Sequence, residues 1–252
     1  MNLRKSALAL LDLQSKSSDN DGTKVVYIIR HGEKVWMPSN TTAYKFACES
    51  EQGWARAYNM PSVFGTPPKE GLVTPGALFS FNYDNGDFDC RTSRGYYRTQ
   101  ATIAPLGQVL DLEINNQTGS KPNLCGKTLD SLGCHPPPPS GSPHDFGPCC
   151  NSAAADAMKA SLFNGDADTT SVLAAWEHSK INFLVDALAG KNIEVPWPGT
   201  QFDKIVAVYF DAVTEEFLRV DQDLFQGFEW IGPTEASTVD YSFGPGEHPG
   251  IN

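Results

Sequence analysis

An arginine and a histidine side by side near the N-terminus are the residues of this chain best suited to chemistry. Arg30 and His31 directly follow a five-residue apolar run, Val25 to Ile29, and Gly32 and Glu33 come next. The run predicts a buried strand, and ligands of open α/β sheets bind where such strands end. Arginine can hold an oxyanion there through two hydrogen bonds, and a neutral imidazole can attack phosphorus. The pattern therefore predicts phosphoryl chemistry.

The segment Val25 to Glu33, VVYIIRHGE, resembles the signature of the histidine phosphatase superfamily, the phosphoglycerate-mutase-like proteins. The resemblance extends over about residues 24 to 210. It implies a second arginine on a helix after the second strand and a second histidine at the end of a late strand. It implies no cofactor and no metal, and the expected partner is a small phosphorylated substrate.

The second arginine of the resemblance is Arg98, which forms an Arg-x-x-x-Thr pattern with Thr102. A helix N-terminus there would favour a bound anion through its dipole and its free N–H groups. Family members often carry Ser-Pro a few residues earlier, whereas Thr92-Ser93-Arg94 lacks the proline. Arg91 and Arg94 therefore stay alternative ligands.

The second histidine of the resemblance is His178, which comes just after the apolar run 171–176. Ser179 follows it, where the family usually has Gly or Asp. His144-Asp145 resembles the His-Asp pair of the acid-phosphatase branch, but no strand precedes it and Pro and Gly surround it. We therefore favour His178 over His144.

The resemblance assigns roles to four residues that occur in the family order. His31 is the expected nucleophile, which would form a phosphohistidine. Arg30, Arg98 and His178 are expected to hold the oxygens of the phosphoryl group.

The sequence leaves the general acid open. Many relatives carry a carboxylate after the third strand, and between residues 114 and 144 the one acidic residue is Asp130. Glu177 adjoins His178, although neighbouring strand positions point to opposite faces of a sheet. Glu33 lies close to the nucleophile in sequence. Asp130 and Glu177 are the candidate acids.

Strand and helix patterns alternate along the chain. We expect strands near 25–29, 77–81, 112–114, 171–176 and 205–210, with an edge strand at 216–220. We expect helices from about residue 50, at 96–112 with a kink or new turn at Pro105, at 153–163 capped by Asn151-Ser152, and at 179–189. The alternation predicts the α/β class, as a three-layer α/β/α sandwich with a mostly parallel central sheet.

The expected organisation is one catalytic domain between two irregular ends. Residues 1–23 read as a flexible N-terminal segment, 24–232 as the domain, and 233–252 as an irregular tail. An irregular Cys- and Pro-rich insertion occupies 118–150, beside the rim of the site.

Cysteine usage bears on the compartment. The chain has six cysteines: Cys48, Cys90, Cys125, Cys134, Cys149 and Cys150. An even number concentrated in loops favours disulfides and an oxidising compartment. The spacing from Cys125 to Cys134 is wider than zinc sites use, which favours disulfides over a metal-binding module. The N-terminal apolar patch is a poor secretory signal, so the sequence leaves the localisation open.

Charge and composition exclude some classes of binding partner. The net charge is −11 with no basic stripe, which excludes a nucleic-acid partner. No apolar run reaches the roughly 20 residues that a bilayer span needs.

The leading hypothesis is a phosphomonoester hydrolase. The alternatives are phosphoglycerate-mutase-type phosphotransfer, which needs more basic residues, and a catalytically inactive binding protein on the same fold. The sequence does not set the substrate or the oligomeric state.

Overall fold

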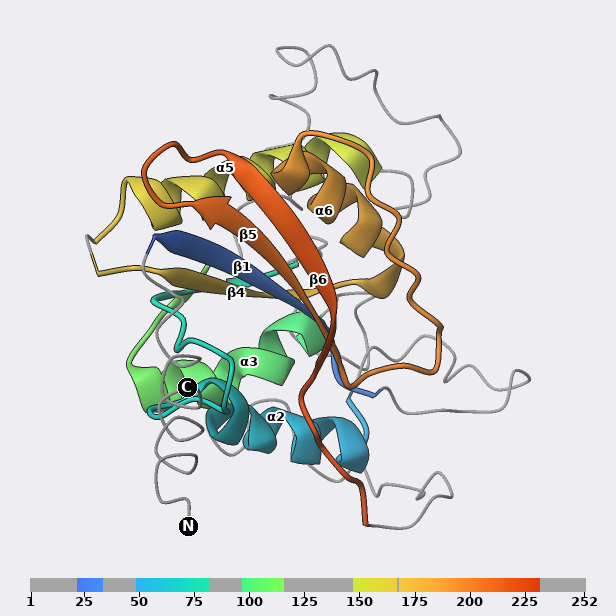
Figure 1. Ribbon diagram of the computed structural model, residues 1–252. Helices are drawn as coiled ribbons and strands as arrows, with labels where there is room; N and C mark the ends of the chain where they lie inside the picture. Colours follow the sequence, from blue (N-terminus) through green and yellow to red (C-terminus); the bar gives the residue numbers. More distant parts are fainter. Residues whose placement is uncertain (1–21, 34–48, 82–96, 116–146, 167, 232–252) are drawn as a thin grey trace, which may run out of the picture.

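The computed structural model describes residues 22–33, 49–81, 97–115, 147–166 and 168–231. Within these ranges six strands form one sheet, with helices on both faces (Figure 1). The strands are β1 (Thr23–Arg30), β2 (Ala77–Ser80), β3 (Ile114–Asn115), β4 (Ser171–Trp176), β5 (Lys204–Asp211) and β6 (Phe217–Phe225). The helices are α2 (Glu51–Phe64), α3 (Tyr97–Leu110), α5 (Gly147–Phe163), the short 3₁₀ helix η4 (His178–Lys180) and α6 (Ile181–Ala189).

The sheet has the strand order β3-β2-β4-β1-β5-β6. β2 pairs in parallel with β3 and β4, and β4 pairs in parallel with β1, whereas β5 is antiparallel to both β1 and β6. This confirms the three-layer sandwich with a mostly parallel sheet. The carboxyl ends of β1, β2 and β4 therefore meet at one edge of the sheet.

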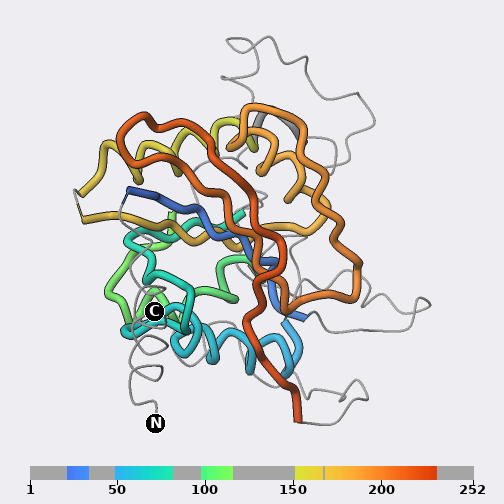
Figure 2. Tube along the Cα trace, in the orientation of Figure 1, coloured from blue at the N-terminus to red at the C-terminus, as the bar shows by residue number. Residues whose placement is uncertain are grey.

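The apolar runs of the sequence are explained by burial on both faces of the central strands. Val26 and Ile28 of β1 pack toward α5 and α6, while Tyr27 and Ile29 pack toward α2 and α3. The Cα trace shows β1 and β4 running side by side although they are far apart in the sequence (Figure 2). This two-sided core fixes where the two strands end.

The structure differs from the prediction at α5. The helix already begins at Gly147, so Asn151 does not cap it but lies inside it, fully buried. Its Oδ1 accepts a hydrogen bond of 2.7 Å from Nε1 of Trp176, a large buried side chain at the end of β4. A buried indole N–H needs an acceptor, which explains a residue of low helix propensity at this position.

Pro105 does not divide α3, which continues through it as one helix.

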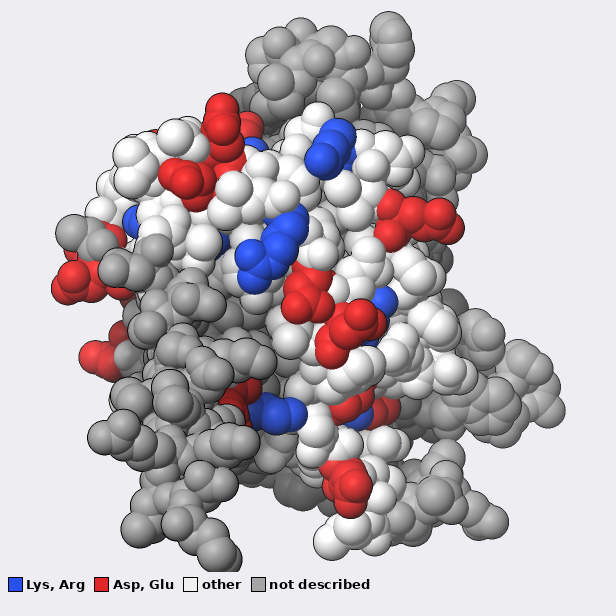
Figure 3. Space-filling model, in the orientation of Figure 1, with Lys and Arg blue, Asp and Glu red and all other residues white. Residues whose placement is uncertain are grey.

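Several predictions concern parts of the chain outside the described residues. These parts are the N-terminal segment, most of the insertion at 118–150, the tail from residue 232 and the side chains of all six cysteines. Within the described ranges, none of the helices is both long and apolar enough to span a bilayer. On the face shown in Figure 3, Lys and Arg are interspersed with Asp and Glu and form no basic stripe.

A buried arginine ties the end of β1 to the rest of the domain. Arg56 of α2 has 4% of its surface exposed. Its Nε and Nη2 atoms donate to the two carboxylate oxygens of Glu33 at 2.9 and 2.6 Å. Its Nη1 atom donates to Asp203 at 3.3 Å and to Gln226 at 3.0 Å. The residues that follow β1 are therefore anchored to α2 and to the start of β5.

We expect Arg56→Met to lower the free energy of unfolding by about 3–5 kcal/mol, because it leaves the Glu33 carboxylate buried without its partner. Arg219→Met is the matched control, since Arg219 is exposed on β6, and should cost about 1 kcal/mol or less. Urea unfolding curves of both variants measure this. Equal losses would contradict the anchoring role of Arg56.

Candidate active site

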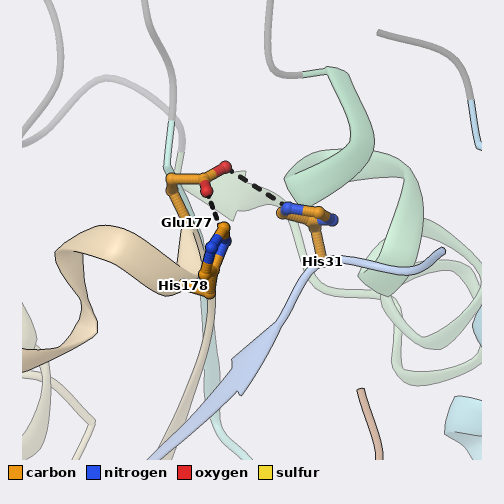
Figure 4. Close-up of side chains that lie close together, drawn as sticks. All are labelled: His31, Glu177 and His178. Atoms are coloured by element: carbon orange, nitrogen blue, oxygen red, sulfur yellow. Dashed lines mark ion pairs between the residues drawn. The ribbon is translucent and has the colours of Figure 1, made fainter. Parts of the chain in front are cut away.

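Two histidines and a glutamate meet where β1 and β4 end. The parallel register pairs Arg30 with Trp176, and the next N–H, of His31, donates to the carbonyl of Trp176 at 3.1 Å. Glu177 and His178 therefore come next to His31 in space. In Figure 4 the Glu177 carboxyl group points toward both imidazole rings. The expected alternation of faces was misleading for Glu177, because β4 ends at Trp176 and the chain turns there into η4.

The protonation of His31 follows from its hydrogen bond to the backbone. The ring is 2% exposed, and its Nδ1 atom lies 2.7 Å from the carbonyl oxygen of Gly32. A carbonyl oxygen accepts only, so Nδ1 carries the hydrogen and Nε2 carries the lone pair. Burial and the nearby charge of Arg98, whose Nε lies 3.4 Å from Nδ1, lower the pKa of His31. The imidazole is therefore neutral at neutral pH.

Glu177 bridges the two histidines. Its Oε1 lies 2.6 Å from Nδ1 of His178, and its Oε2 lies 3.3 Å from Nε2 of His31 (Figure 4). Burial alone would raise the pKa of Glu177, but the hydrogen bond and charge of His178 oppose it, and the pKa lies well below its usual range. His31 adds to this lowering only when Nε2 also carries a proton. An ionised carboxylate then faces the lone pair of Nε2. One proton between Oε2 and Nε2 would satisfy both atoms.

Two buried arginines add positive charge beside this cluster. Arg30 is 5% exposed and Arg98 is 7% exposed. Burial lowers the pKa of Arg30 to about 10, against an opposing effect of the Glu177 charge, so it is charged at neutral pH. Its Nη1 atom donates to the carbonyl of Gly199 at 2.6 Å, whereas its buried Nε has no hydrogen-bond partner among the described residues. A buried charged donor without an acceptor indicates a place for an anion.

Glu33 does not take part in the cluster of His31, Glu177 and His178 as a general acid would. Glu33, close to His31 in sequence, is held by Arg56, so its carboxylate is committed to an ion pair. The positions of Asp130, Arg91, Arg94 and His144 lie outside the described residues. Glu177 is thus the one of the two candidate acids that the structure places at the site.

The sequence did not identify Glu49 and Phe202, two of the residues next to the site, and it identified Thr102 only as part of the Arg-x-x-x-Thr pattern. Phe202 stacks on the Arg30 guanidinium at 3.8 Å, and its ring centre lies 6.1 Å from that of His31. Thr102 accepts the N–H of Gly32 at 2.7 Å, and Glu49 lies 2.7 Å from the Thr102 hydroxyl. Glu49 and Phe202 follow no pattern in the sequence.

The same cluster contains groups that could bind a metal. One ligand atom each from His31, Glu177 and His178 lies within 4.8 Å of the others, and zinc uses ligands of these types. However, Arg98 contacts the same imidazole, and the charge of Arg30 interacts with Glu177. Two fixed cations disfavour a divalent cation and favour an anion at this position.

Comparisons with known proteins give similarities of fold. No protein-family model matches the chain, and no curated protein matches it. The structure of mycobacterial hydrolase 2 is 16% identical with a TM-score of 0.49, covering 84% of this chain and 94% of its own. Mycobacterial glucosyl-3-phosphoglycerate phosphatase is 16% identical with a TM-score of 0.44, covering 81% and 98%. YhfR of Bacillus stearothermophilus is 13% identical with a TM-score of 0.43, covering 79% and 96%.

We expect two substitutions to move the pKa of His31 in opposite directions. Arg98→Met should raise it, because the positive charge of Arg98 disfavours the imidazolium. Glu177→Gln should lower it, because the carboxylate favours the imidazolium. Titration of the ¹⁵N-labelled imidazole by NMR measures both shifts. Shifts of the same sign would contradict the placement of Arg98 and Glu177 beside the His31 imidazole.

Proposed function

We propose that this protein is a phosphomonoester hydrolase that works through a phosphohistidine on His31. The observation that carries this proposal is the state of His31, a buried neutral imidazole whose Nδ1 is tied to the Gly32 carbonyl. Its Nε2 lone pair faces a cluster with two buried arginines. The resemblance of VVYIIRHGE to the histidine phosphatase signature supports the same conclusion.

The buried cations hold the phosphoryl group of the substrate. The Arg30 Nε, which lacks an acceptor among the described residues, donates to one phosphoryl oxygen, and Arg98 neutralises the charge of another. His178, whose side chain is 34% exposed, contacts a third oxygen from the mouth of the site. Stabilisation of phosphoryl charge by fixed cations is the main catalytic device of phosphoryl transfer.

In the first step, the Nε2 lone pair of His31 attacks phosphorus, and the bond from phosphorus to the leaving oxygen breaks. His31 keeps its proton on Nδ1, and the positive charge that develops on the ring is stabilised by the Gly32 carbonyl. Glu177 protonates the leaving oxygen. The carboxyl group takes up this proton from the solvent when the substrate binds, because the anionic phosphoryl group that enters beside it raises the pKa of Glu177.

In the second step, water attacks the phosphohistidine. The Glu177 carboxylate takes a proton from the water, the N–P bond breaks, and its electron pair returns to Nε2. The products are the alcohol and inorganic phosphate. Glu177 returns its proton to the solvent as phosphate leaves, and the enzyme regains its starting protonation state. A carboxyl group that acts first as acid and then as base follows from the two-step route.

We expect His31→Ala to abolish hydrolysis of p-nitrophenyl phosphate, because the variant lacks the imidazole that we propose as the nucleophile. Rapid acid-free quenching with ³²P-labelled substrate should trap label on wild-type protein, and mass spectrometry should place it on His31. Label that passes to a second alcohol rather than to water would indicate a mutase. No label and no turnover would favour a binding protein.

We expect the effect of Glu177→Gln to depend on the leaving group. The loss of kcat should reach about 10²- to 10⁴-fold for an alkyl phosphate, whose alkoxide needs a proton. It should be far smaller for p-nitrophenyl phosphate, whose phenolate leaves unaided. Glu216→Gln is the matched control, since Glu216 is exposed. An equal loss with both substrates would exclude Glu177 as the general acid.

A further inference from the structure

A second carboxyl group, that of Glu49, lies buried behind the nucleophile. Glu49 precedes α2 and is 5% exposed. Its Oε1 lies 2.7 Å from the Thr102 hydroxyl, and its Oε2 is buried without a hydrogen-bond partner among the described residues. A methyl group on the Gly32 Cα would lie 2.7 Å from Oε1. The carboxyl group is thus packed directly against the turn that orients His31.

The hydrogens around Thr102 constrain the state of Glu49. The Thr102 Oγ1 atom has three polar neighbours, the N–H of Gly32 at 2.7 Å, the carbonyl of Arg98 at 2.6 Å and the Oε1 of Glu49 at 2.7 Å. A hydroxyl has one hydrogen and accepts through its lone pairs. The Gly32 N–H donates to it, and the Arg98 carbonyl can only accept its single hydrogen. Two oxygens, that of the Arg98 carbonyl and Oε1 of Glu49, therefore face one hydroxyl hydrogen. All three contacts are hydrogen bonds at once only if Glu49 supplies a proton.

We propose that Glu49 is a positioning residue that stays protonated in the active protein, donates to Thr102, and so fixes the Gly32 peptide that orients His31. This role rests on the function proposed above. The Gly32 peptide group carries both links, because its N–H is held by Thr102 and its carbonyl accepts from Nδ1 of His31. An ionised Glu49 would compete with the Arg98 carbonyl for the Thr102 hydrogen. This competition would weaken the hold of Thr102 on the Gly32 N–H.

The charges around Glu49 agree with a protonated carboxyl group. Burial raises the pKa of Glu49 to about 8, and the charge of Glu33 adds to the rise. Thr102, the charge of Arg98 and the backbone N–H of Gly32 oppose it but do not outweigh burial. Arg98 faces it from α3 and Glu33 from the segment after β1, whereas α2 meets it through the uncharged Gly53. Ionisation in this place would leave Oε2 as an unpaired buried charge.

Stability provides a test that does not require activity. A carboxyl group whose pKa is raised on folding adds stability that is complete below its unfolded pKa and is lost as the pH rises through about 8. The difference in Tm between wild type and Glu49→Gln should therefore change steadily to the disadvantage of wild type as the pH rises from about 5 to 9. Glu51→Gln, an exposed position on α2, is the control and should show no such trend. A pH-independent difference for Glu49→Gln would overturn the proposal.

Positioning is tested on His31 itself. Glu49→Gln, which keeps a donor, should preserve the ¹⁵N signals of the His31 imidazole and kcat within about threefold, whereas Glu49→Ala should disturb the signals and lower kcat about 10- to 100-fold with little change in KM. If Glu49→Ala does not fold, Thr102→Val breaks the same link at nearly equal volume and should disturb the His31 signals alike. Undisturbed signals in the folded variant would overturn the proposal.

The two proposals fail separately. Wild-type protein that hydrolyses no phosphomonoester, together with the expected Tm trend and the expected His31 signals, would refute the proposed function and leave the placement of His31 by Glu49 standing. Normal hydrolysis by wild type with unchanged kcat and His31 signals in Glu49→Ala would refute the role of Glu49 alone.

Discussion

The peptide group of Gly32 is the constraint on which the site depends. Its carbonyl fixes the tautomer of His31, and its N–H is held by Thr102 of α3. On the carboxyl side, Glu33 is anchored through Arg56 to α2 and to the start of β5. Strand β1 therefore delivers its last residues into a turn that is held from two sides, and a ring that is fixed in orientation and tautomer loses little entropy when it reacts.

The buried charges of the site explain how a protein of negative net charge can attract an anion. A chain of net charge −11 must still offer an anion a favourable place. The site does this by burying Arg30 and Arg98 at one edge of the sheet and setting the Glu177 carboxylate against them. Because burial weakens solvent screening, these few charges outweigh the field of the distant surface carboxylates. In the mechanism that we propose, an entering phosphoryl group also raises the pKa of Glu177, which couples binding to proton transfer.

Much of the architecture could be predicted, because its signals are local. The central strands are unbroken apolar runs, and the resemblance carried by VVYIIRHGE and the Arg-x-x-x-Thr pattern implied that His31 and Arg98 lie at one edge. The errors have definite causes. Asn151 looked like a helix cap but serves a buried indole of the next strand. Glu177 was expected to face away, but the strand ends one residue before it.

The sequence by itself determined the α/β sandwich and the residue types that lie together at the carboxyl edge of its parallel strands. It did so because burial on both faces of a strand and the turn after it leave clear local patterns. Only the tertiary structure decided which nitrogen of His31 carries the proton, which carboxyl group faces it and that Glu49 lies behind it. Those states depend on desolvation and on contacts such as that of Glu49 with Thr102, 53 positions apart, and no local pattern records them.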